Sequence, residues 1–253
     1  MPGGVQGLDR YAYVGNNPVA YVDPSGHMPI DNECGLNGEE CKSSDACTDP
    51  FVCPGFFLVG SPEDIQAVLD ILNTALSGTG YTVSANQYGG ITFTQTGGST
   101  FISPEQQALI DALTTYTNVN VNFAIKVSRN GPPGTLVDCY PCGELYIDDI
   151  EAFGTSAGVS SLSTLIHSFE EQYQRQVNGL CDTRECYLKA HALAVVAEEA
   201  VAGADRVEDY GGSVGYVSVF LYDYGGGCYF YTAVIPTDPI TVQKINGCMN
   251  YPP

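Results

Sequence analysis

The sequence predicts a mixed α+β fold in which a helical hairpin packs on an antiparallel sheet, preceded by a cysteine-rich connector held by disulfides. Three observations lead to this fold class: two helix starts of the same type, several short segments in which apolar residues alternate, and 10 cysteines in 253 residues. With 44% hydrophobic residues, the chain can bury one good core or two small ones. We divide it into a terminal β segment at 1–26, a connector at 27–56 and a main domain at 57–253.

The connector is defined by four cysteines with loop-forming residues between them. These cysteines are separated by 7, 6 and 6 positions, with Gly, Pro, Asp and Asn in the intervals: Cys34, Cys41, Cys47 and Cys53. Such a composition does not bury enough apolar surface to form a core of its own. We therefore expect a loop-rich segment stapled by disulfides, without a chemical role.

The same start signal predicts two helices in the main domain. Ser61 and Ser103 are each followed by proline and then by an acidic residue, the pattern of an N-cap, a first helical position and a first turn. The first helix presents one apolar face and ends at Gly78–Gly80; that face consists of Ile65, Val68, Leu69, Leu72, Ala75 and Leu76. The second helix presents Leu109, Leu113 and Tyr116.

Strands are predicted where apolar residues alternate between turn signals. Residues 81–84 and 91–94 flank Gly89-Gly90, and residues 214–224 and 229–235 flank three glycines, so each pair predicts a hairpin. Residues 119–127 alternate like a strand with one buried face. Cys228 and Cys248 are placed to tie the last hairpin to the chain that follows it.

Residues 160–203 have a helical pattern that is interrupted at Asn178-Gly179 and by the loop 180–186. A short loop between two helices predicts an αα-hairpin, and we expect Cys181 and Cys186 to staple its turn. Cys139 and Cys142 have the C-x2-C spacing, but no second close pair complements them as a structural zinc site requires. A disulfide is therefore the simpler use of that pair.

Charge excludes some classes of partner. The chain has 9 Lys and Arg against 29 Asp and Glu, a formal net charge of −20, and no basic residue between Lys42 and Lys126. Such a surface repels a phosphate backbone and an anionic membrane, so we expect no nucleic-acid partner. The longest apolar runs are too short to span a membrane, and no signal peptide opens the chain, so we expect export to be specified upstream.

The residues that point to chemistry are two of the three histidines, one on each helix of the predicted hairpin. Glu171 follows His167 by four positions and stands about 40° from it in projection, while Glu198 follows His191 by seven positions and stands about 20° away. Two imidazoles and two carboxylates on facing helices suit zinc. The sequence therefore predicts His167, Glu171, His191 and Glu198 as metal ligands, although a histidine on a helix face is more often a structural residue.

Residues 7–26 read GLDRYAYVGNNPVAYVDPSG, which in structural terms is two short strands with an Asn-Pro turn and a DPSG turn. This segment resembles the RYxYxxNNPxxYxDPxG end of the RHS-associated core found in YD-repeat proteins. The resemblance implies that the rest of the chain is the C-terminal effector domain of a polymorphic toxin. It also implies secretion, or delivery by a secretion system, as part of a larger RHS protein.

A second resemblance concerns residues 145–154, LYIDDIEAFG, and the helix that follows. Together they resemble the HExxH metallopeptidase-like domains of RHS-linked effectors, with a strand-rich segment leading into the helix. The resemblance implies that His167 is the first ligand and that Glu198 or Glu199 is the downstream carboxylate. Ser168 stands where the family has its water-activating glutamate, and Glu171 stands where it has its second histidine.

Because Ser168 replaces the glutamate of the family's motif, another residue has to act as the general base. Glu170 is a weak candidate, since at three positions from His167 it has to turn inward. We expect a zinc-metallopeptidase-like hydrolase, degenerate in its motif, that acts on a target-cell protein or peptide, with a cognate immunity protein as the further partner to look for. The alternative is a non-enzymatic, disulfide-stapled domain that binds a target-cell protein.

Other chemistries have less support. A nucleobase deaminase needs an H-x-E motif before P-C-x-x-C, and no H-x-E occurs in the chain. A serine hydrolase needs a histidine as the base of its triad, and neither histidine of the predicted hairpin lies in a loop, where such a base is expected. An ADP-ribosylating toxin remains open, although few basic residues exist to bind its dinucleotide.

Overall fold

The structure is a computed structural model that describes residues 53–99, 101–132, 136–155, 158–211, 218–225, 228–235, 237 and 239–248. Contacts divide the chain into two units, 1–46 and 47–253, and the described residues all belong to the second. The RHS-like segment 1–26 and the connector up to residue 52 lie outside the described residues.

One sheet forms the centre of the described unit, with strand order β1-β4-β6-β5. Its strands are β1 (Gly55–Val59), β4 (Asn122–Ser128), β6 (Glu144–Tyr146) and β5 (Asp138–Cys139). β1 and β6 both run parallel to β4, whereas β5 runs antiparallel to β6. The expectation of an antiparallel sheet is therefore wrong for this sheet. Parallel strands need a long crossover, and α1, α2 and a hairpin separate β1 from β4.

The core begins inside the range expected to be connector. Cys53 and Phe56 are buried, and β1 starts at Gly55. The boundary at residue 57 is thus too late, because an apolar run of four residues, Phe56 to Val59, supplies a buried strand.

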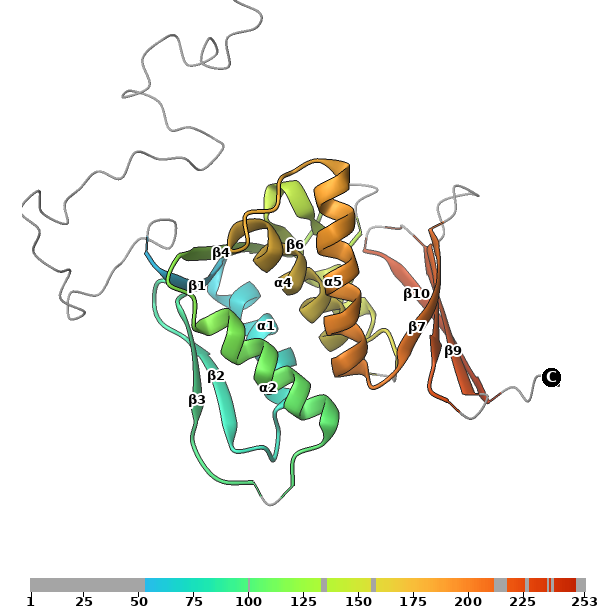
Figure 1. The fold of residues 1–253 in the computed structure, drawn as a ribbon, viewed down its shortest axis with the longest axis horizontal. Coiled ribbons are helices and arrows are strands. Elements are labelled where there is room, and N and C mark those ends of the chain that lie inside the picture. The colour runs from blue at the N-terminus through green and yellow to red at the C-terminus, as the bar shows by residue number, and fades with distance from the viewer. Residues whose placement is uncertain are drawn as a thin grey trace, which may run out of the picture. The chain divides into compact units, whose positions relative to one another are not determined.

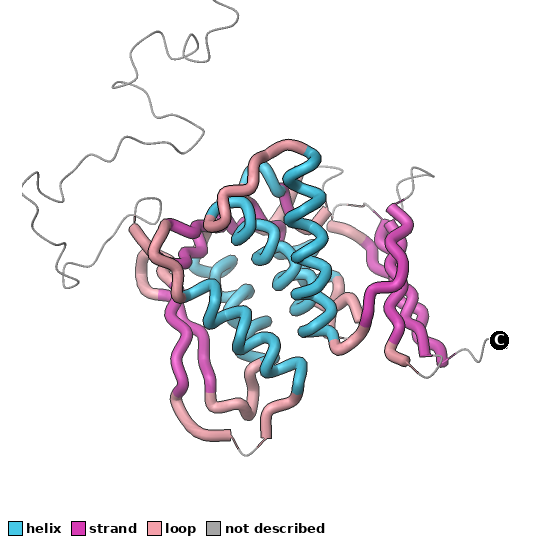
Figure 2. Tube along the Cα trace, viewed as in Figure 1, coloured by secondary structure: helices cyan, strands magenta, loops and turns pink. Residues whose placement is uncertain are grey.

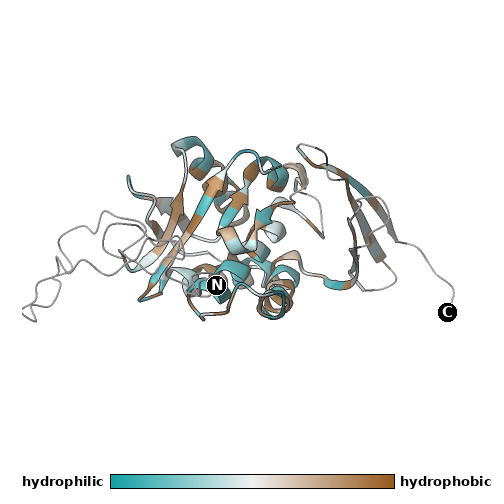
Figure 3. Cartoon of the chain, turned by 90° about the horizontal axis from the view of Figure 1, so that it is seen from above, coloured by the Kyte–Doolittle hydropathy of each residue, from teal (hydrophilic) through white to brown (hydrophobic). Residues whose placement is uncertain are grey.

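The helices α1 (Pro62–Ala75) and α2 (Pro104–Thr117) begin where their start signals predict. The Ser61 hydroxyl accepts a hydrogen bond from the Asp64 backbone N–H at 3.1 Å, and Ser103 forms a capping box with Gln106. Val68 and Leu113 are fully buried on their inner faces. Figure 3 shows brown, hydrophobic stretches on the strands between the helices.

Both predicted hairpins are confirmed. β2 (Tyr81–Ala85) pairs antiparallel with β3 (Ile91–Gln95), and β8 (Ser218–Asp223) pairs antiparallel with β9 (Cys228–Ile235). β7 (Asp205–Gly211) and β10 (Thr241–Cys248) complete a second, antiparallel sheet of order β10-β9-β8-β7. Cys228 and Cys248 are register partners in this sheet, and Cys228 is disulfide-bonded.

The segment 145–154 is less strand-rich than expected. The strand β6 ends at Tyr146, and α3 (Ile147–Ala152) follows at once. Between β5 and β6, a 3-10 turn η3 (Tyr140–Cys142) is closed by the disulfide Cys139–Cys142, as the sequence predicts.

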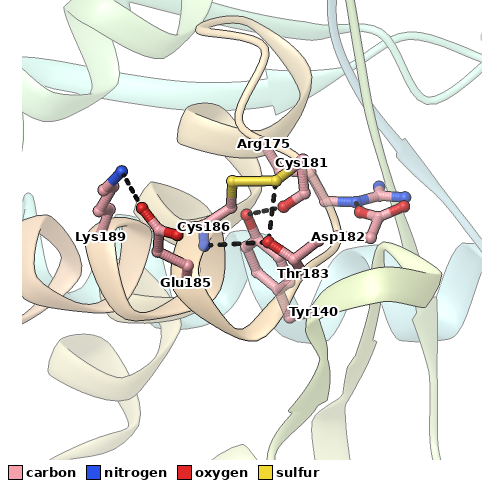
Figure 4. Close-up of a disulfide and its surroundings, with 8 residues drawn as sticks. All are labelled: Tyr140, Arg175, Cys181, Asp182, Thr183, Glu185, Cys186 and Lys189. Carbon is pink, nitrogen blue, oxygen red and sulfur yellow. Dashed lines mark hydrogen bonds and ion pairs between the residues drawn. A yellow bond between two sulfur atoms is a disulfide. The ribbon is translucent and has the colours of Figure 1, made fainter.

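The helices α4 (Ser161–Gln176) and α5 (Arg184–Ala202) lie side by side, as Figures 1 and 2 show. The predicted disulfide Cys181–Cys186 closes the loop between them, and the Thr183 hydroxyl caps α5 by accepting from the Cys186 backbone N–H (Figure 4). Arg175, near the end of α4, pairs with Asp182 in the same loop at 2.5 Å.

The inner face of α4 contributes to the main core. Leu165, Ile166 and Phe169 are fully buried, and the Phe169 ring meets Phe56 edge-on with centroids 5.2 Å apart. This packing fixes α4 against β1, so the opposite face of the helix is held toward α5. None of the helices in the described part of the chain has the length and apolar character needed to cross a membrane.

Candidate metal centre

Three of the four predicted ligands converge between α4 and α5. Their ligand atoms, from His167, Glu171 and His191, all lie within 4.8 Å of one another. His167 and Glu171 are one turn apart on α4, which places them on a single face, and His191 approaches from α5. The local spacing therefore sets one half of the group, and the packing of the two helices sets the other.

The three atoms form a nearly equilateral triangle. His167 Nε2 lies 3.1 Å from Glu171 Oε1 and 3.1 Å from His191 Nδ1, and His191 Nδ1 lies 2.8 Å from Glu171 Oε1. Ligands of a tetrahedral zinc ion with bonds of about 2.0 to 2.1 Å are separated by about 3.3 Å. A point about 2.1 Å from all three atoms lies about 1.2 Å above their plane. A zinc ion fits the triangle after shifts of a few tenths of an ångström.

The three side chains that form this triangle differ in exposure, and that of His191 is the most exposed. The side chains of Glu171, His167 and His191 are 2%, 12% and 24% exposed, in that order. The carboxylate is thus sequestered, while one imidazole edge meets solvent. The Tyr187 hydroxyl lies 3.4 Å from His191 Nδ1 and helps to line this side.

Glu198 lies beside His167 but on the other side of its ring. Glu198 Oε2 is 2.8 Å from His167 Nδ1, whereas Nε2 is the nitrogen that faces Glu171 and His191. The group able to hold one ion therefore consists of His167, Glu171 and His191 without Glu198. Seven residues along α5 separate Glu198 from His191 by about 10.5 Å, and Glu198 meets the opposite nitrogen of the His167 ring instead.

The position of Glu198 is that of a carboxylate that orients a ligand histidine. Its Oε2 also accepts from Arg206 Nη1 at 3.1 Å, and its Oε1 accepts from the Tyr222 hydroxyl. Glu198 and Arg206 are both almost fully buried. Residues of β7 and β8 in the antiparallel sheet therefore hold the Glu198 carboxylate, which in turn orients the His167 ring.

Electrostatics in the metal-free site favour a proton on His167. Burial lowers the pKa of His167, but hydrogen bonds to Glu171 and Glu198 outweigh it and raise the pKa to about 10. Burial likewise raises the pKa of Glu171, and its hydrogen bonds with the two histidines reverse the effect, so this pKa is lowered. A cation is therefore stabilised between these carboxylates, whether a proton or a metal ion supplies the charge.

Glu170, the candidate base, is not brought to this group. Its Oε2 accepts from the Tyr116 hydroxyl at 2.8 Å, and its Oε1 accepts from Gln174 Nε2 at 2.6 Å. Burial and the charge of Glu170 raise the pKa of Tyr116 well above its usual value. The carboxylate points toward α2 because it lies 100° around α4 from Glu171.

The acidic residue that the sequence reasoning missed is Asp138, on β5. Burial and the charge of Glu171 raise the pKa of its carboxyl to about 6, while Ser168, His167 and His191 act in the opposite direction. Asp138 therefore shares one electrostatic environment with the metal-ligand group. The sequence around Asp138 carries no motif of an acid or base. Its neighbour Cys139 is a disulfide cysteine and does not predict a site of this kind.

Comparison of the chain with family models, curated proteins and solved structures finds no match. The chemistry of the site is therefore argued from its own residues. Two imidazole nitrogens and one carboxylate oxygen make a donor set that zinc accepts, and three protein ligands leave a coordination position for water or substrate. Such a centre can polarise a carbonyl group and activate water.

Proposed function

We propose that the part of the chain that begins with β1 forms the effector domain of an RHS-type polymorphic toxin and that this domain is a zinc-dependent, metallopeptidase-like hydrolase. The observation that carries the proposal is the triangle formed by His167 Nε2, Glu171 Oε1 and His191 Nδ1. It gathers two of the three histidines of a histidine-poor chain at one point.

The donor set favours zinc over the alkaline-earth cations. Calcium and magnesium prefer six or more oxygen ligands, whereas the triangle offers two nitrogens and one oxygen. Imidazole suits zinc, and two histidines with one glutamate are a ligand set of catalytic zinc sites. We therefore assign zinc as the ion of this site.

A catalytic role is supported by what the site leaves open. A structural zinc site is usually closed by four protein ligands, but among the described residues three converge here. The side chain of His191 is the most exposed of the three, so we expect a substrate to reach the fourth position on its side. When bound, the ion supplies Lewis-acid chemistry, while Glu198 keeps His167 in the orientation that presents Nε2.

The context of an exported toxin is supported by two independent features. Residues 7–26 carry the RHS-like motif, and the described part of the chain contains the disulfides Cys139–Cys142 and Cys181–Cys186, which suit an oxidising environment. On this account the protein is delivered as part of a larger RHS protein, acts on a target-cell protein or peptide, and has a cognate immunity protein.

One observation favours a second candidate, a non-enzymatic domain that binds a target-cell protein. Leu188, Leu193 and Val196 are exposed on the outer face of α5. Exposed apolar side chains on one helix face suit contact with another protein. A binding domain of this kind needs no metal.

Metal analysis separates the two candidates. Protein purified without chelator should contain one zinc ion per chain, and His167→Ala with His191→Ala should contain none. Glu185→Gln, at an exposed ion pair with Lys189 on α5, is the matched control and should keep its zinc. Absence of zinc from the parent protein, or retention of zinc by the double variant, would leave the binding domain as the better account.

A further inference from the structure

We propose that Asp138 is the general base of this centre, taking the place of the glutamate that α4 lacks at position 168. The proposal rests on the hydrolase function argued above and adds a catalytic residue to it. Asp138 comes from β5 in the sheet, so the base and the metal ligands belong to different parts of the fold.

The segment that carries Asp138 is fastened along one face of α4. Gln172 Nε2 donates to the Tyr140 carbonyl at 2.9 Å, and Arg175 Nη2 donates to the Pro141 carbonyl at 2.8 Å. Ser168, Gln172 and Arg175 follow one another at four and three positions, so they form a single stripe on the helix. Asp138 precedes Tyr140 by two residues, and Ser168 of this stripe is among the groups that act on its carboxyl.

The position of Asp138 is also set from the sheet side. Asp138 pairs with the fully buried Leu145 of β6, and the disulfide Cys139–Cys142 closes the turn directly after it. The Tyr140 ring packs edge-on against Tyr187, which in turn packs against His191. The segment is thus fixed relative to both metal-binding helices.

The buried hydroxyl of Ser168 also points to Asp138. This hydroxyl is fully buried and reaches no partner with hydrogen-bond geometry among the described residues. It is nevertheless close enough to lower the pKa of the Asp138 carboxyl. Buried hydroxyl groups are nearly always satisfied, so the Asp138 carboxylate is the natural acceptor for this hydroxyl.

The groups that face Asp138 are suited to a proton acceptor. Burial and Glu171 raise its pKa to about 6, against the influence of Ser168 and of the two histidines. Glu170, bound to Tyr116 and Gln174, has no comparable position.

The chemical step is a hydrolysis without an additional reagent. A water molecule gives one proton to the Asp138 carboxylate as its oxygen adds to the carbonyl carbon of the substrate. The bond from that carbon to the leaving oxygen or nitrogen then breaks, and Asp138 returns the proton to the leaving atom. The products are an acid and an alcohol or amine, and Asp138 is again a carboxylate.

The first test compares Asp138→Asn with Asp111→Asn, which removes an exposed carboxylate on α2. Zinc content reports on the metal site, and hydrolysis of 4-nitrophenyl acetate, a small activated ester, reports on the base. We expect one zinc ion per chain in all three proteins and a loss of about 100-fold or more in kcat/KM for Asp138→Asn alone. Full activity in Asp138→Asn with zinc bound would overturn the assignment of the base and leave the metal site standing.

The second test needs no activity. Ser168→Glu places a second carboxylate beside Asp138 in buried space, and we expect the melting temperature to fall by roughly 10 °C. The double variant Ser168→Glu with Asp138→Ser carries its carboxylate on α4 instead of β5. We expect it to regain at least about half of the melting temperature that Ser168→Glu loses, and to regain the hydrolysis that Asp138→Ser loses. Additive losses in melting temperature would show that the two positions are not neighbours and would overturn the proposal.

The outcomes distinguish this inference from the proposed function. A parent protein without zinc refutes the zinc hydrolase itself. A zinc-loaded parent protein that hydrolyses the ester no faster than its His167→Ala and His191→Ala double variant also refutes the hydrolase, whereas a zinc-loaded and fully active Asp138→Asn variant refutes only the base.

Discussion

Glu198 Oε2 lies 2.8 Å from Nδ1 of His167, the ring nitrogen that faces away from Glu171 and His191. The same oxygen accepts from Arg206, so a buried ion pair anchors the carboxylate that orients the histidine. The consequence is that His167 presents Nε2 to the triangle, and that the antiparallel sheet contributes to a site formed by two helices.

Replacing Glu198 should weaken zinc binding without removing a ligand. We expect Glu198→Gln to raise the dissociation constant of zinc by about 10- to 100-fold, the usual effect of losing a partner of a ligand histidine. Competition with a chromogenic chelator measures this constant. Because the substitution also removes the negative charge that Glu198 offers to Arg206, a milder variant serves as a comparison. Tyr222→Phe removes only the hydroxyl that donates to Glu198 and should show a smaller loss in the same direction. An unchanged constant in folded Glu198→Gln would contradict the orienting role.

The metal-free protein should lose stability as the pH rises above neutral. The pKa of His167 is about 10 in the folded protein against 6.5 for an ordinary histidine, so its contribution is complete below about pH 6.5 and disappears as the pH approaches 10. We expect the melting temperature to fall by several degrees between pH 7 and pH 10.

A second group titrates in this range with the opposite sign. The Lys244 ammonium donates to the Phe153 and Val159 carbonyls, and burial lowers its pKa to about 8, so its contribution grows as the pH rises. The difference between the parent protein and His167→Gln isolates the histidine. A difference in melting temperature that is the same at pH 7 and pH 10 would refute the proton on His167.

The disulfide at the loop between α4 and α5 should stabilise the fold but not create the site. Closing a loop of this size contributes about 2 kcal/mol, so Cys181→Ser with Cys186→Ser should lower the melting temperature by roughly 4 to 8 °C. Zinc content should stay at one ion per chain, since neither sulfur lies in the triangle. Loss of zinc at a temperature where the variant is folded would show that the loop positions the ligands.

The RHS-like segment should be dispensable for the stability of the effector. Residues 1–26 fall within the unit 1–46, separate from the unit that holds the described fold. Strands of this kind normally pair within a larger shell. We expect a variant lacking residues 1–26 to melt within about 2 °C of the full chain by differential scanning calorimetry. A large loss would show that the segment completes one of the sheets.

Much of the local structure is predictable because its causes are local. The Ser-Pro starts at Ser61 and Ser103 specify a cap and a first turn, and both helices begin there. The four-residue spacing of His167 and Glu171 fixes their common face within a single helix. The turn between α4 and α5 is equally local, and its cysteines pair as their spacing predicts.

What could not be predicted depends on contacts between distant segments. Strand direction in the sheet of β1, β4 and β6 follows from the path of the crossovers, which periodicity does not encode. Glu198 shares a projected face with His191, but the packing of α5 against α4 places it at His167 instead. The segment that carries Asp138 is bound to α4 by Gln172 and Arg175, which are distant from it in the sequence.

The measurement that tests the central claim most directly is X-ray diffraction from crystals of the protein on both sides of the zinc absorption edge. The account predicts a single anomalous peak between α4 and α5, at about 2.0 to 2.2 Å from His167 Nε2, His191 Nδ1 and Glu171 Oε1, that disappears below the edge. A zinc-soaked crystal with no peak at this triangle, or with a peak bound only by other residues, would contradict it.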